Sequence, residues 1–291
     1  MSVAPRKRYS LRLKPGTIDL GERTLVMGIL NVTPDSFSDA GRHFDFHSAL
    51  REALDLIVAG ADLLDIGGES TRPQSEPVPV DVELERVIPI IEAIRKSSDI
   101  PISIDTTKAD VAEAAIAAGA DIINDVSALR FDVRMADLAA RVGVPVILMH
   151  MQGTPKTMQQ NPSYGSLFSE IIAFLEERIH YAASCGIDRE QIVVDPGIGF
   201  GKTVAHNLAI VRDLDLFRSM DRPILMGASR KRFIGSVLDR PVEDREVGTA
   251  VVNAVSIAAG AHIIRVHDVE THRQVALMAD ALRDPEMGEA F

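Results

Sequence analysis

Short apolar runs alternate with longer amphipathic segments along almost the whole chain. The apolar runs have the length of strands, and between them apolar residues recur at helical spacing. The runs begin near Thr24, Asp62, Ile100, Asp121, Pro145, Ile192, Pro223 and His262. The helical patterns cover residues 48–58, 81–95, 109–118, 133–141, 167–183, 205–218, 245–259 and 271–282. Strands that are apolar almost throughout are typical of a parallel sheet buried on both faces.

The regular alternation of strand and helix predicts an α/β protein, a single (β/α)8 TIM barrel over residues 24–291. Residues 1–23 are predicted to form a tail and a β-hairpin, because apolar and polar positions alternate on both sides of a Lys-Pro-Gly turn. We expect this hairpin to cap the bottom of the barrel. A doubly wound open sheet is the alternative.

The connections between the predicted elements differ in length at the two ends of the barrel. Links from helix to strand are mostly short, whereas three links from strand to helix are long, at residues 31–47, 67–80 and 151–166. The loops that follow the strands carry the active site of such barrels. We therefore expect a site at the carboxyl ends of the strands.

Composition narrows the classes of partner. The chain of 291 residues has a formal net charge of −11, which argues against nucleic acid as the main partner. An anionic substrate must then be met by local basic residues. No apolar run approaches the ~18 residues that a membrane span requires, so no membrane partner is expected. The single cysteine, Cys185, fits a reducing compartment, and we expect a cytoplasmic protein.

Polar side chains stand at the ends of the predicted strands. Asp105 and Asp195 end strands on opposite sides of the barrel, and Asn124 ends the strand after Asp105. Either aspartate alone could simply cap the following helix. Two carboxylates and an amide that face one cavity suit a ring rich in N–H donors, such as a pterin, a purine or a flavin. Asp65 and Asp125 have a similar local setting, but we expect structural roles for them.

Basic side chains follow three of the strands. The candidates are Arg72, Lys231, Arg265 and His267. Any one of them could be a solvated surface charge, but alternation along the strand directs Arg265 and His267 the same way. Arginine presents a planar fork to phosphate oxygens, and the phosphate site of a barrel typically lies beside its last two strands. We therefore favour phosphate binding for this group.

The loop after the first barrel strand is rich in oxygen ligands. Asn31, Asp35 and Asp39 together suggest Mg²⁺, a hard ion that keeps several waters and few protein ligands. No pattern of His, Cys and Glu supports zinc or iron.

A glycine-rich stretch follows Asp195. Gly197-Ile-Gly-Phe-Gly201, with the Lys-Thr that follows, is similar to part of a phosphate-binding P-loop. That pattern requires a glycine at the position where Pro196 stands. We interpret the stretch as a tight turn that lets Phe200 project beside Asp195.

Taken together, the motifs resemble those of the dihydropteroate synthase family, in family order from about Leu25 to Leu282. They are Asn31-Val-Thr-Pro-Asp-Ser-Phe-Ser-Asp39, Asp65-Ile-Gly-Gly-Glu-Ser-Thr-Arg-Pro73, Ser103-Ile-Asp-Thr106, Ile123-Asn-Asp-Val-Ser127, Leu148-Met-His-Met-Gln-Gly153, Asp195-Pro-Gly-Ile-Gly-Phe-Gly201, Ser229-Arg-Lys231 and Arg265-Val-His267. The resemblance implies a TIM barrel that joins 7,8-dihydropterin-6-ylmethyl diphosphate to 4-aminobenzoate and releases pyrophosphate.

The resemblance also implies roles for the matching residues. The pterin would be held by Asp105, Asn124, Val126, Met149, Asp195 and Lys231. The pyrophosphate would be gripped by Arg72, Arg265 and His267, and its Mg²⁺ would be bound by Asn31. The 4-aminobenzoate pocket would be shaped by Phe37, Thr71, Pro73 and Phe200. Asp35 and Asp39 would belong to a lid loop. Catalysis would depend on Asp105, Asp195, Lys231, Arg265 and His267.

The implied reaction needs no strong base. Mg²⁺ and the cations stabilise the departing pyrophosphate, and the electron-rich pterin delocalises the cation left behind, so we expect an SN1-like substitution. A homodimer is also expected from the resemblance. Ala128 stands where glycine is common in the family, and Arg232 stands where serine is common. The Arg232 change leaves the response to sulfonamides open, including an insensitive enzyme.

Two other functions compete with this one. A folate-dependent (corrinoid) methyltransferase on the same type of barrel would need the pterin residues but no pyrophosphate site, so Arg72, Arg265 and His267 argue against it. A non-catalytic pterin-binding protein would not need Asn31 or Lys231. A measurement of pyrophosphate release separates the three functions.

Overall fold

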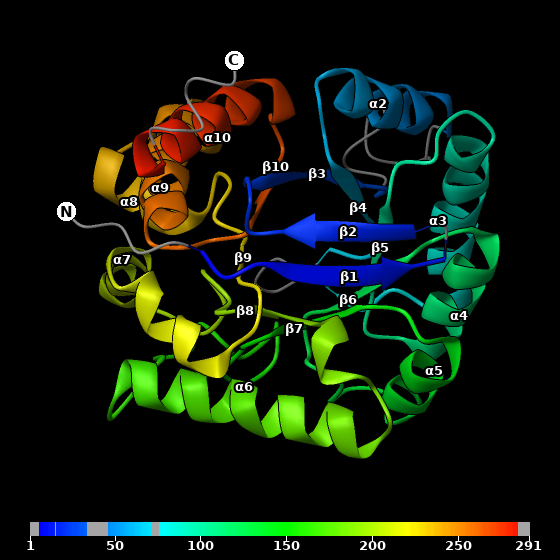
Figure 1. Cartoon of the computed structure of the whole chain (residues 1–291), viewed down its shortest axis with the longest axis horizontal. Helices are drawn as coiled ribbons and strands as arrows, with labels where there is room; N and C mark the ends of the chain where they lie inside the picture. The colour runs from blue at the N-terminus through cyan, green and yellow to red at the C-terminus, as the bar shows by residue number, and fades with distance from the viewer. Residues whose placement is uncertain (1–5, 15, 34–45, 71–75, 285–291) are drawn as a thin grey trace.

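The strands and helices follow one another in the predicted order (Figure 1). The structure, a computed structural model of the chain, describes residues 6–14, 16–33, 46–70 and 76–284. The barrel strands are β3 (Leu25–Asn31), β4 (Leu63–Gly67), β5 (Ile102–Asp105), β6 (Ile122–Asp125), β7 (Val146–Met149), β8 (Ile192–Asp195), β9 (Leu225–Met226) and β10 (Ile263–Val266). The α-helices in these ranges are α2 (Phe46–Val58), α3 (Val80–Arg95), α4 (Ala109–Ala118), α5 (Arg134–Val142), α6 (Leu167–Ser184), α7 (Val204–Arg212), α8 (Arg232–Leu238), α9 (Glu246–Ala258) and α10 (Val269–Arg283).

Hydrogen bonds join the strands into a ring. The sheet runs β8-β7-β6-β5-β4-β3-β10-β9, and its strands pair in parallel. Its two ends meet at a parallel bridge between Val194 of β8 and Ile224, the residue before β9. An open doubly wound sheet would leave two separate edges, so the barrel prediction is confirmed and the alternative is wrong. No helix in the described ranges combines the length and apolar character of a membrane span.

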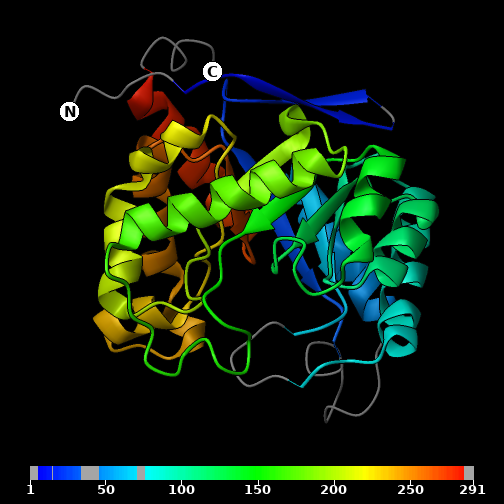
Figure 2. The ribbon, with the colours of Figure 1, turned by 90° about the horizontal axis from the view of Figure 1, so that it is seen from below.

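A hairpin covers the amino ends of the barrel strands. Its strands, β1 (Tyr9–Leu13) and β2 (Gly16–Leu20), pair antiparallel. Leu11 and Leu20 are each 1% exposed and pack with inward-facing barrel residues such as Met27. In Figure 2 the hairpin lies at the top, and the green loop that follows β7 lies at the opposite end. The hairpin therefore caps the bottom of the barrel, as predicted.

One predicted helix is too long. The pattern over residues 205–218 predicts a single helix, but α7 ends at Arg212. Asp213 leaves helical geometry, with φ −112° and ψ 34°, and a 3₁₀-helix continues over Leu214–Met220. Apolar spacing alone does not separate these two helix types, because both bury residues three positions apart.

The sequence does not predict α8. This helix has seven residues and carries Gly235 at its centre. A Cβ at that position would collide with the side chain of Arg245, so the glycine permits close packing. A helix this short with a central glycine has almost no periodic signal.

Arg6 ties the N-terminal segment to the barrel. Its side chain is 1% exposed, and its Nη2 donates to Asp280 Oδ1 of α10 at 2.6 Å. Its Nη1 donates to Thr24 Oγ1 and to the carbonyl of Ala261, both at 2.6 Å. Burial lowers the pKa of Arg6 to about 10, against the opposing charge of Asp280. The guanidinium therefore stays charged and closes the bottom of the barrel beside the hairpin.

Replacement of Arg6 by Met should destabilise the whole domain. Breaking a buried ion pair costs about 3–5 kcal/mol, and Asp280 would keep only the Arg283 Nε, at 3.6 Å, as a paired cation. We expect the free energy of unfolding in urea to fall by that amount, and Arg6→Met combined with Asp280→Leu to recover part of it. The matched control is Arg12→Met, since the Arg12–Asp188 pair is exposed. A loss below about 1 kcal/mol in Arg6→Met would contradict the assignment.

Candidate active site

Side chains from neighbouring strands meet at the carboxyl end of the barrel. In the register of the sheet, Asp105 of β5 lies beside Asn124 of β6, and Met149 of β7 lies beside Asp195 of β8. These four residues are between 3% and 8% exposed. Register partners point to the same side of a sheet, so four of the predicted pterin residues share one buried region.

Arg265 of β10 joins these groups across the barrel. Its Nε donates to Asp65 Oδ2 at 2.5 Å, and its Nη2 donates to Asp105 Oδ2 at 2.9 Å. Asn124 Nδ2 donates to the same Asp65 oxygen at 3.1 Å. Asp65 is 0% exposed and orients both Arg265 and Asn124.

A structural role was expected for Asp65, and the structure places it inside the site, where it positions other residues. The alternation of side chains along the strand is the signal that could predict the position of Asp65. Asp65 lies two residues before Gly67, and Gly67 is the register partner of Asp105. Asp65 and Asp105 must then face the same interior. Asp125, by contrast, accepts from the amides of Ser127 and Leu129, each at 2.8 Å, and stabilises the turn after β6, as expected.

The glycine-rich turn after β8 lies between Asp195 and Lys231. Asp195 Oδ1 accepts from the Gly197 amide at 2.6 Å, and Lys231 Nζ donates to the Ile198 carbonyl. Lys231 Nζ also lies 4.5 Å from the centre of the Phe200 ring. That ring packs on an apolar cluster formed by Val126, Met149, Met151 and Met158. The turn thus places Phe200 beside three of the predicted pterin residues.

The remaining predicted anion ligands lie at the ends of β10 and β3. His267 Nδ1 is 2.8 Å from Ser229 Oγ, which also accepts from the His267 amide at 3.3 Å. Ser229 therefore fixes the orientation of the imidazole. Asn31 is the last residue of β3 and the register partner of Gly67, which in turn pairs with Asp105. Asn31 and Asp105 accordingly lie at the same level of the barrel.

Several predicted site residues fall outside the ranges that the structure describes. They are Asp35, Phe37 and Asp39 after β3, and Thr71, Arg72 and Pro73 after β4. Both segments follow strands whose carboxyl ends border the site.

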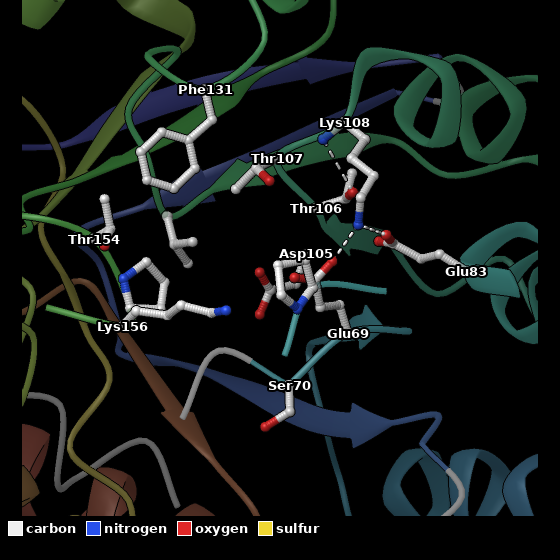
Figure 3. A pocket seen from close by; sticks show the side chains of 13 residues that line it. Glu69, Ser70, Glu83, Asp105, Thr106, Thr107, Lys108, Phe131, Thr154 and Lys156 are labelled. Carbon is white, nitrogen blue, oxygen red and sulfur yellow. Dashed lines mark hydrogen bonds and ion pairs between the residues drawn. The ribbon is translucent and has the colours of Figure 1, made fainter. Parts of the chain in front are cut away.

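A cavity of about 260 Å³ extends from Asp105 beneath the loops that follow β4, β5, β6 and β7. Figure 3 shows Lys108 directed at two carboxylates, Glu69 and Glu83, while Lys156 reaches in from the opposite wall. Glu83 is 0% exposed, so the Lys108 ammonium balances a fully buried charge. The sequence does not predict Lys108 and Glu83 as site residues, because neither stands in a motif that marks a ligand.

Burial perturbs the ionisable groups at the centre of the site. Burial and then the neighbouring Asp65 raise the pKa of Asp105 to about 7, against the charge of Arg265. Burial raises the pKa of Asp195 too, and Lys231 is its strongest opposing charge. Burial lowers the pKa of Lys231 to about 8, although Asp195 favours its charged form. Such shifts in a group of interacting side chains are typical of an active site.

The fold and the site together define a TIM-barrel enzyme that binds a flat nitrogen heterocycle beside an anion. Carboxylates and an amide lie beside the apolar cluster of Val126, Met149, Met151 and Met158, which is called the slot below. Arginine and histidine lie next to them. The sequence pattern of the family described as pterin binding enzyme matches residues 27–267. The chain belongs to the dihydropteroate synthase family.

Named relatives match over nearly the full length of the chain. The dihydropteroate synthase of Synechocystis sp. is 48% identical over 265 residues, which cover 91% of this chain and 92% of that protein. The Yersinia pestis dihydropteroate synthase, solved with a sulfonamide drug, has a TM-score of 0.89 and 42% identity, with 95% and 99% of the two chains covered. The Xanthomonas albilineans enzyme with 4-aminobenzoic acid has a TM-score of 0.88 and 42% identity, with 96% and 99% covered.

Replacement of Asp65 by Asn should weaken catalysis while the barrel stays folded. The amide keeps the size of the side chain but removes the charge that holds Arg265, and a hydrogen bond to a charged group contributes about 1.5–3 kcal/mol. We expect kcat/KM for the pterin diphosphate to fall roughly 10- to 100-fold. Loss of the Asp65 charge also lowers the pKa of Asp105, so the acid limb near pH 7 should move to lower pH.

Steady-state rates between about pH 5 and about pH 9 test this prediction. The control is Asp121→Asn, which breaks the Arg95–Asp121 ion pair at the opposite end of the barrel. It should reduce stability and leave the acid limb in place. An Asp65→Asn profile that coincides with the parent profile would show that Asp65 does not govern the site.

Proposed function

We propose that this chain condenses 7,8-dihydropterin-6-ylmethyl diphosphate with 4-aminobenzoate to give 7,8-dihydropteroate and pyrophosphate. The observation that carries the proposal is the arrangement of Asp105, Asn124 and Arg265 around one buried carboxylate, Asp65. The chain thereby combines acceptors for a heterocycle with a cation for a phosphate. Its relative from Xanthomonas albilineans, a dihydropteroate synthase solved with 4-aminobenzoic acid, supports the same reaction.

The pterin would lie in the apolar slot between β6, β7 and the turn after β8. Carboxylates accept from the ring N–H groups, and the Asn124 side chain can both donate and accept. Lys231 would donate to a ring acceptor, while Val126 and Met149 would cover the faces of the ring. Asp105 and Asp195 lie on opposite sides of the slot, so a flat ring between them is fixed in its plane.

The diphosphate would lie beside Arg265 and His267. Arg265 has a planar fork, and its contacts with two carboxylates hold that fork in one orientation. His267 is held by Ser229 and adds a further donor. Arg72 belongs to the same proposed set, though it lies outside the described ranges.

The residues present fit Mg²⁺ as an ion that arrives with the diphosphate. In the described ranges no three His, Cys, Asp or Glu side chains are grouped to hold a metal, so phosphate oxygens and water would supply most ligands and Asn31 one more. Mg²⁺ bound there would neutralise charge on the leaving group.

The 4-aminobenzoate would stand against Phe200 at the mouth of the slot. Phe200 is half-buried and its ring lies beneath the Lys231 ammonium. Phe37, Thr71 and Pro73 would complete this pocket, and Asp35 and Asp39 would belong to the loop that closes it. Arg232 begins α8 directly after Lys231 and is exposed. Because Arg232 carries a charged guanidinium, the response of the enzyme to sulfonamides has to be measured.

The chemistry follows from charge stabilisation and positioning. The C–O bond to the diphosphate breaks first, and its electron pair leaves with the pyrophosphate in an SN1-like step. The positive charge left behind spreads over the pterin, where the ionised forms of Asp105 and Asp195 stabilise it in a site of low dielectric. The nitrogen of 4-aminobenzoate then attacks the methylene carbon, and the new C–N bond forms as that nitrogen loses a proton to water.

The folate-dependent methyltransferase would use the same acceptors for its pterin. Its substrate has no diphosphate, so the oriented pair of Arg265 and His267 would have no ligand there. A non-catalytic pterin-binding protein would not need a lysine whose pKa is lowered to about 8 beside Asp195. The named relatives are synthases, and the condensation is the function that all of these observations favour.

We also propose that two copies associate through α8 and α9. Val247, Val251 and Val255 recur on one face of α9 and are 77%, 60% and 42% exposed. Val237 of the neighbouring α8 is 57% exposed. An apolar face of this kind is typical of an interface between subunits. A cytoplasmic location remains an expectation, based on the single cysteine.

Asp195→Asn and Lys231→Ala should each abolish most turnover in a folded protein. Asp195 is buried beside the place where positive charge would develop, and Lys231 would donate to a ring acceptor of the pterin. Loss of one such group reduces kcat roughly 10²- to 10³-fold. Pyrophosphate release is measured with the pterin diphosphate, 4-aminobenzoate and Mg²⁺. The control is Lys96→Ala, whose side chain is exposed at the end of α3 and should matter far less. Near-normal kcat in both site variants would refute the roles proposed for Asp195 and Lys231. Methyl transfer to a corrinoid would favour the folate-dependent methyltransferase.

Val251→Glu should separate the proposed dimer. A carboxylate in the centre of an apolar interface loses its hydration without a partner. Sedimentation equilibrium should give twice the chain mass of 31.6 kDa for the parent and a single chain for the variant. Val133→Glu is the control, because Val133 is 76% exposed at the start of α5 on another part of the barrel. A parent that sediments as one chain refutes the dimer.

A further inference from the structure

The turn of residues 197–201 lies outside helix and sheet, yet each of its carbonyl groups has a donor. Gly197, Gly199 and Gly201 adopt φ of +72°, +81° and +64°, which prevents a regular backbone ladder. The Gly197 carbonyl accepts from the Phe200 amide at 3.1 Å within the turn. The next carbonyls accept from side chains: Ile198 from Lys231, Gly199 from Gln159 at 2.6 Å, Phe200 from Lys202 at 3.0 Å and Gly201 from Tyr164 at 2.7 Å.

Lys202 differs from the other donors because it is buried. It is only 3% exposed, and its Nζ lies 2.9 Å from Nδ1 of His150, which is 5% exposed. Burial lowers the pKa of His150 well below its ordinary value, so the ring is neutral. An imidazole with its proton on Nε2 accepts at Nδ1. The Lys202 amine is therefore held at two points, His150 Nδ1 and the Phe200 carbonyl.

A buried lysine is unfavourable unless its hydrogen bonds compensate for lost hydration. Those bonds run from the loop start after β7, where His150 follows Met149, to the backbone of Phe200. From the other side, Lys231 bonds the Ile198 carbonyl and lies over the Phe200 ring. The two lysines thus donate to different carbonyls of the turn, and the position of the Phe200 ring depends on both.

We propose that Lys202 is a positioning residue: its bonds to His150 and to the Phe200 carbonyl fix the Phe200 ring and so shape the 4-aminobenzoate pocket. The identity of that substrate rests on the proposed function. The hydrogen bonds of Lys202 go to His150 and to the Phe200 carbonyl, so its influence on the pocket runs through Phe200. The pterin residues Asp105 and Asn124 are held separately by Asp65 and Arg265, and Lys202 should leave them in place.

Lys202→Met tests the proposal, because methionine retains most of the volume but donates no hydrogen bond. We expect KM for 4-aminobenzoate to rise at least about 10-fold, as expected for one lost hydrogen bond of about 1.4 kcal/mol. KM for the pterin diphosphate and kcat should stay within about threefold. Parallel increases in both KM values, or an unchanged KM for 4-aminobenzoate in a folded variant, would overturn the proposal.

Two further variants separate positioning from general packing. Lys202→Gln retains a shorter donor and should give an intermediate KM, and it replaces Lys202→Met if that variant does not fold. Tyr164→Phe removes the bond to the Gly201 carbonyl, one residue beyond Phe200, and should leave KM for 4-aminobenzoate within about threefold. An equal effect of Tyr164→Phe would assign the result to the turn as a whole and contradict a specific role of Lys202.

A readout without substrate distinguishes this inference from the proposed reaction. The protein is labelled with 3-fluorophenylalanine, and Phe200→Leu assigns the ¹⁹F resonance of Phe200. Lys202→Met should shift or broaden that resonance, while Tyr164→Phe should not. If the parent enzyme released no pyrophosphate, the proposed function would fail, but a shifted Phe200 signal would still support the positioning role. An unshifted signal overturns it whatever the parent catalyses.

Discussion

The ion pairs of Arg265 with Asp65 and Asp105 are the interactions on which the site depends. A guanidinium at the end of a buried strand is tolerated only when carboxylates compensate for its lost hydration. Because Asp65 also accepts from Asn124, one buried charge orients side chains from β5, β6 and β10. The same contacts specify the register of the sheet. A slip of one residue in any of these strands would turn its side chain to the helix layer and leave a charge unpaired.

Different kinds of interaction stabilise the two sides of the slot. On the side of β5 and β6, charged side chains orient one another. On the side of β8, three glycines with positive φ expose backbone carbonyls, and side chains from several elements donate to them. A Cβ at Gly197 would collide with the carbonyl oxygen of His150, so glycine allows the turn to lie close to the residue that follows β7. The first side suits a polar heterocycle, and the second holds the aromatic ring of Phe200.

The sequence predicts the barrel well because apolar strands and polar strand ends are local signals. Asp105 and Asp195 end their strands and Asn124 stands one residue before the end of β6, and these positions alone predict convergence. The place of Asp65 within the site is not predicted, because Asp65 stands two residues before a strand end and its partner Arg265 lies 200 positions away in sequence. Lys108 and Glu83 meet only in the folded chain for the same reason. Ala128 has φ +54°, a conformation that favours glycine, which explains physically why glycine is common there.

The balance of charge in the site also bears on how the diphosphate leaving group would be neutralised. The chain has a formal net charge of −11, so no general positive field attracts a diphosphate. Arg265 is already shared by two carboxylates, and Lys108 is likewise held by Glu69 and Glu83. His267 carries at most one positive charge and cannot offset a diphosphate by itself. In the proposed function, the additional positive charge would come from Arg72 and from a divalent cation that enters with the substrate. Such a site would bind the diphosphate weakly without the metal, and it would release pyrophosphate together with the ion that neutralises it.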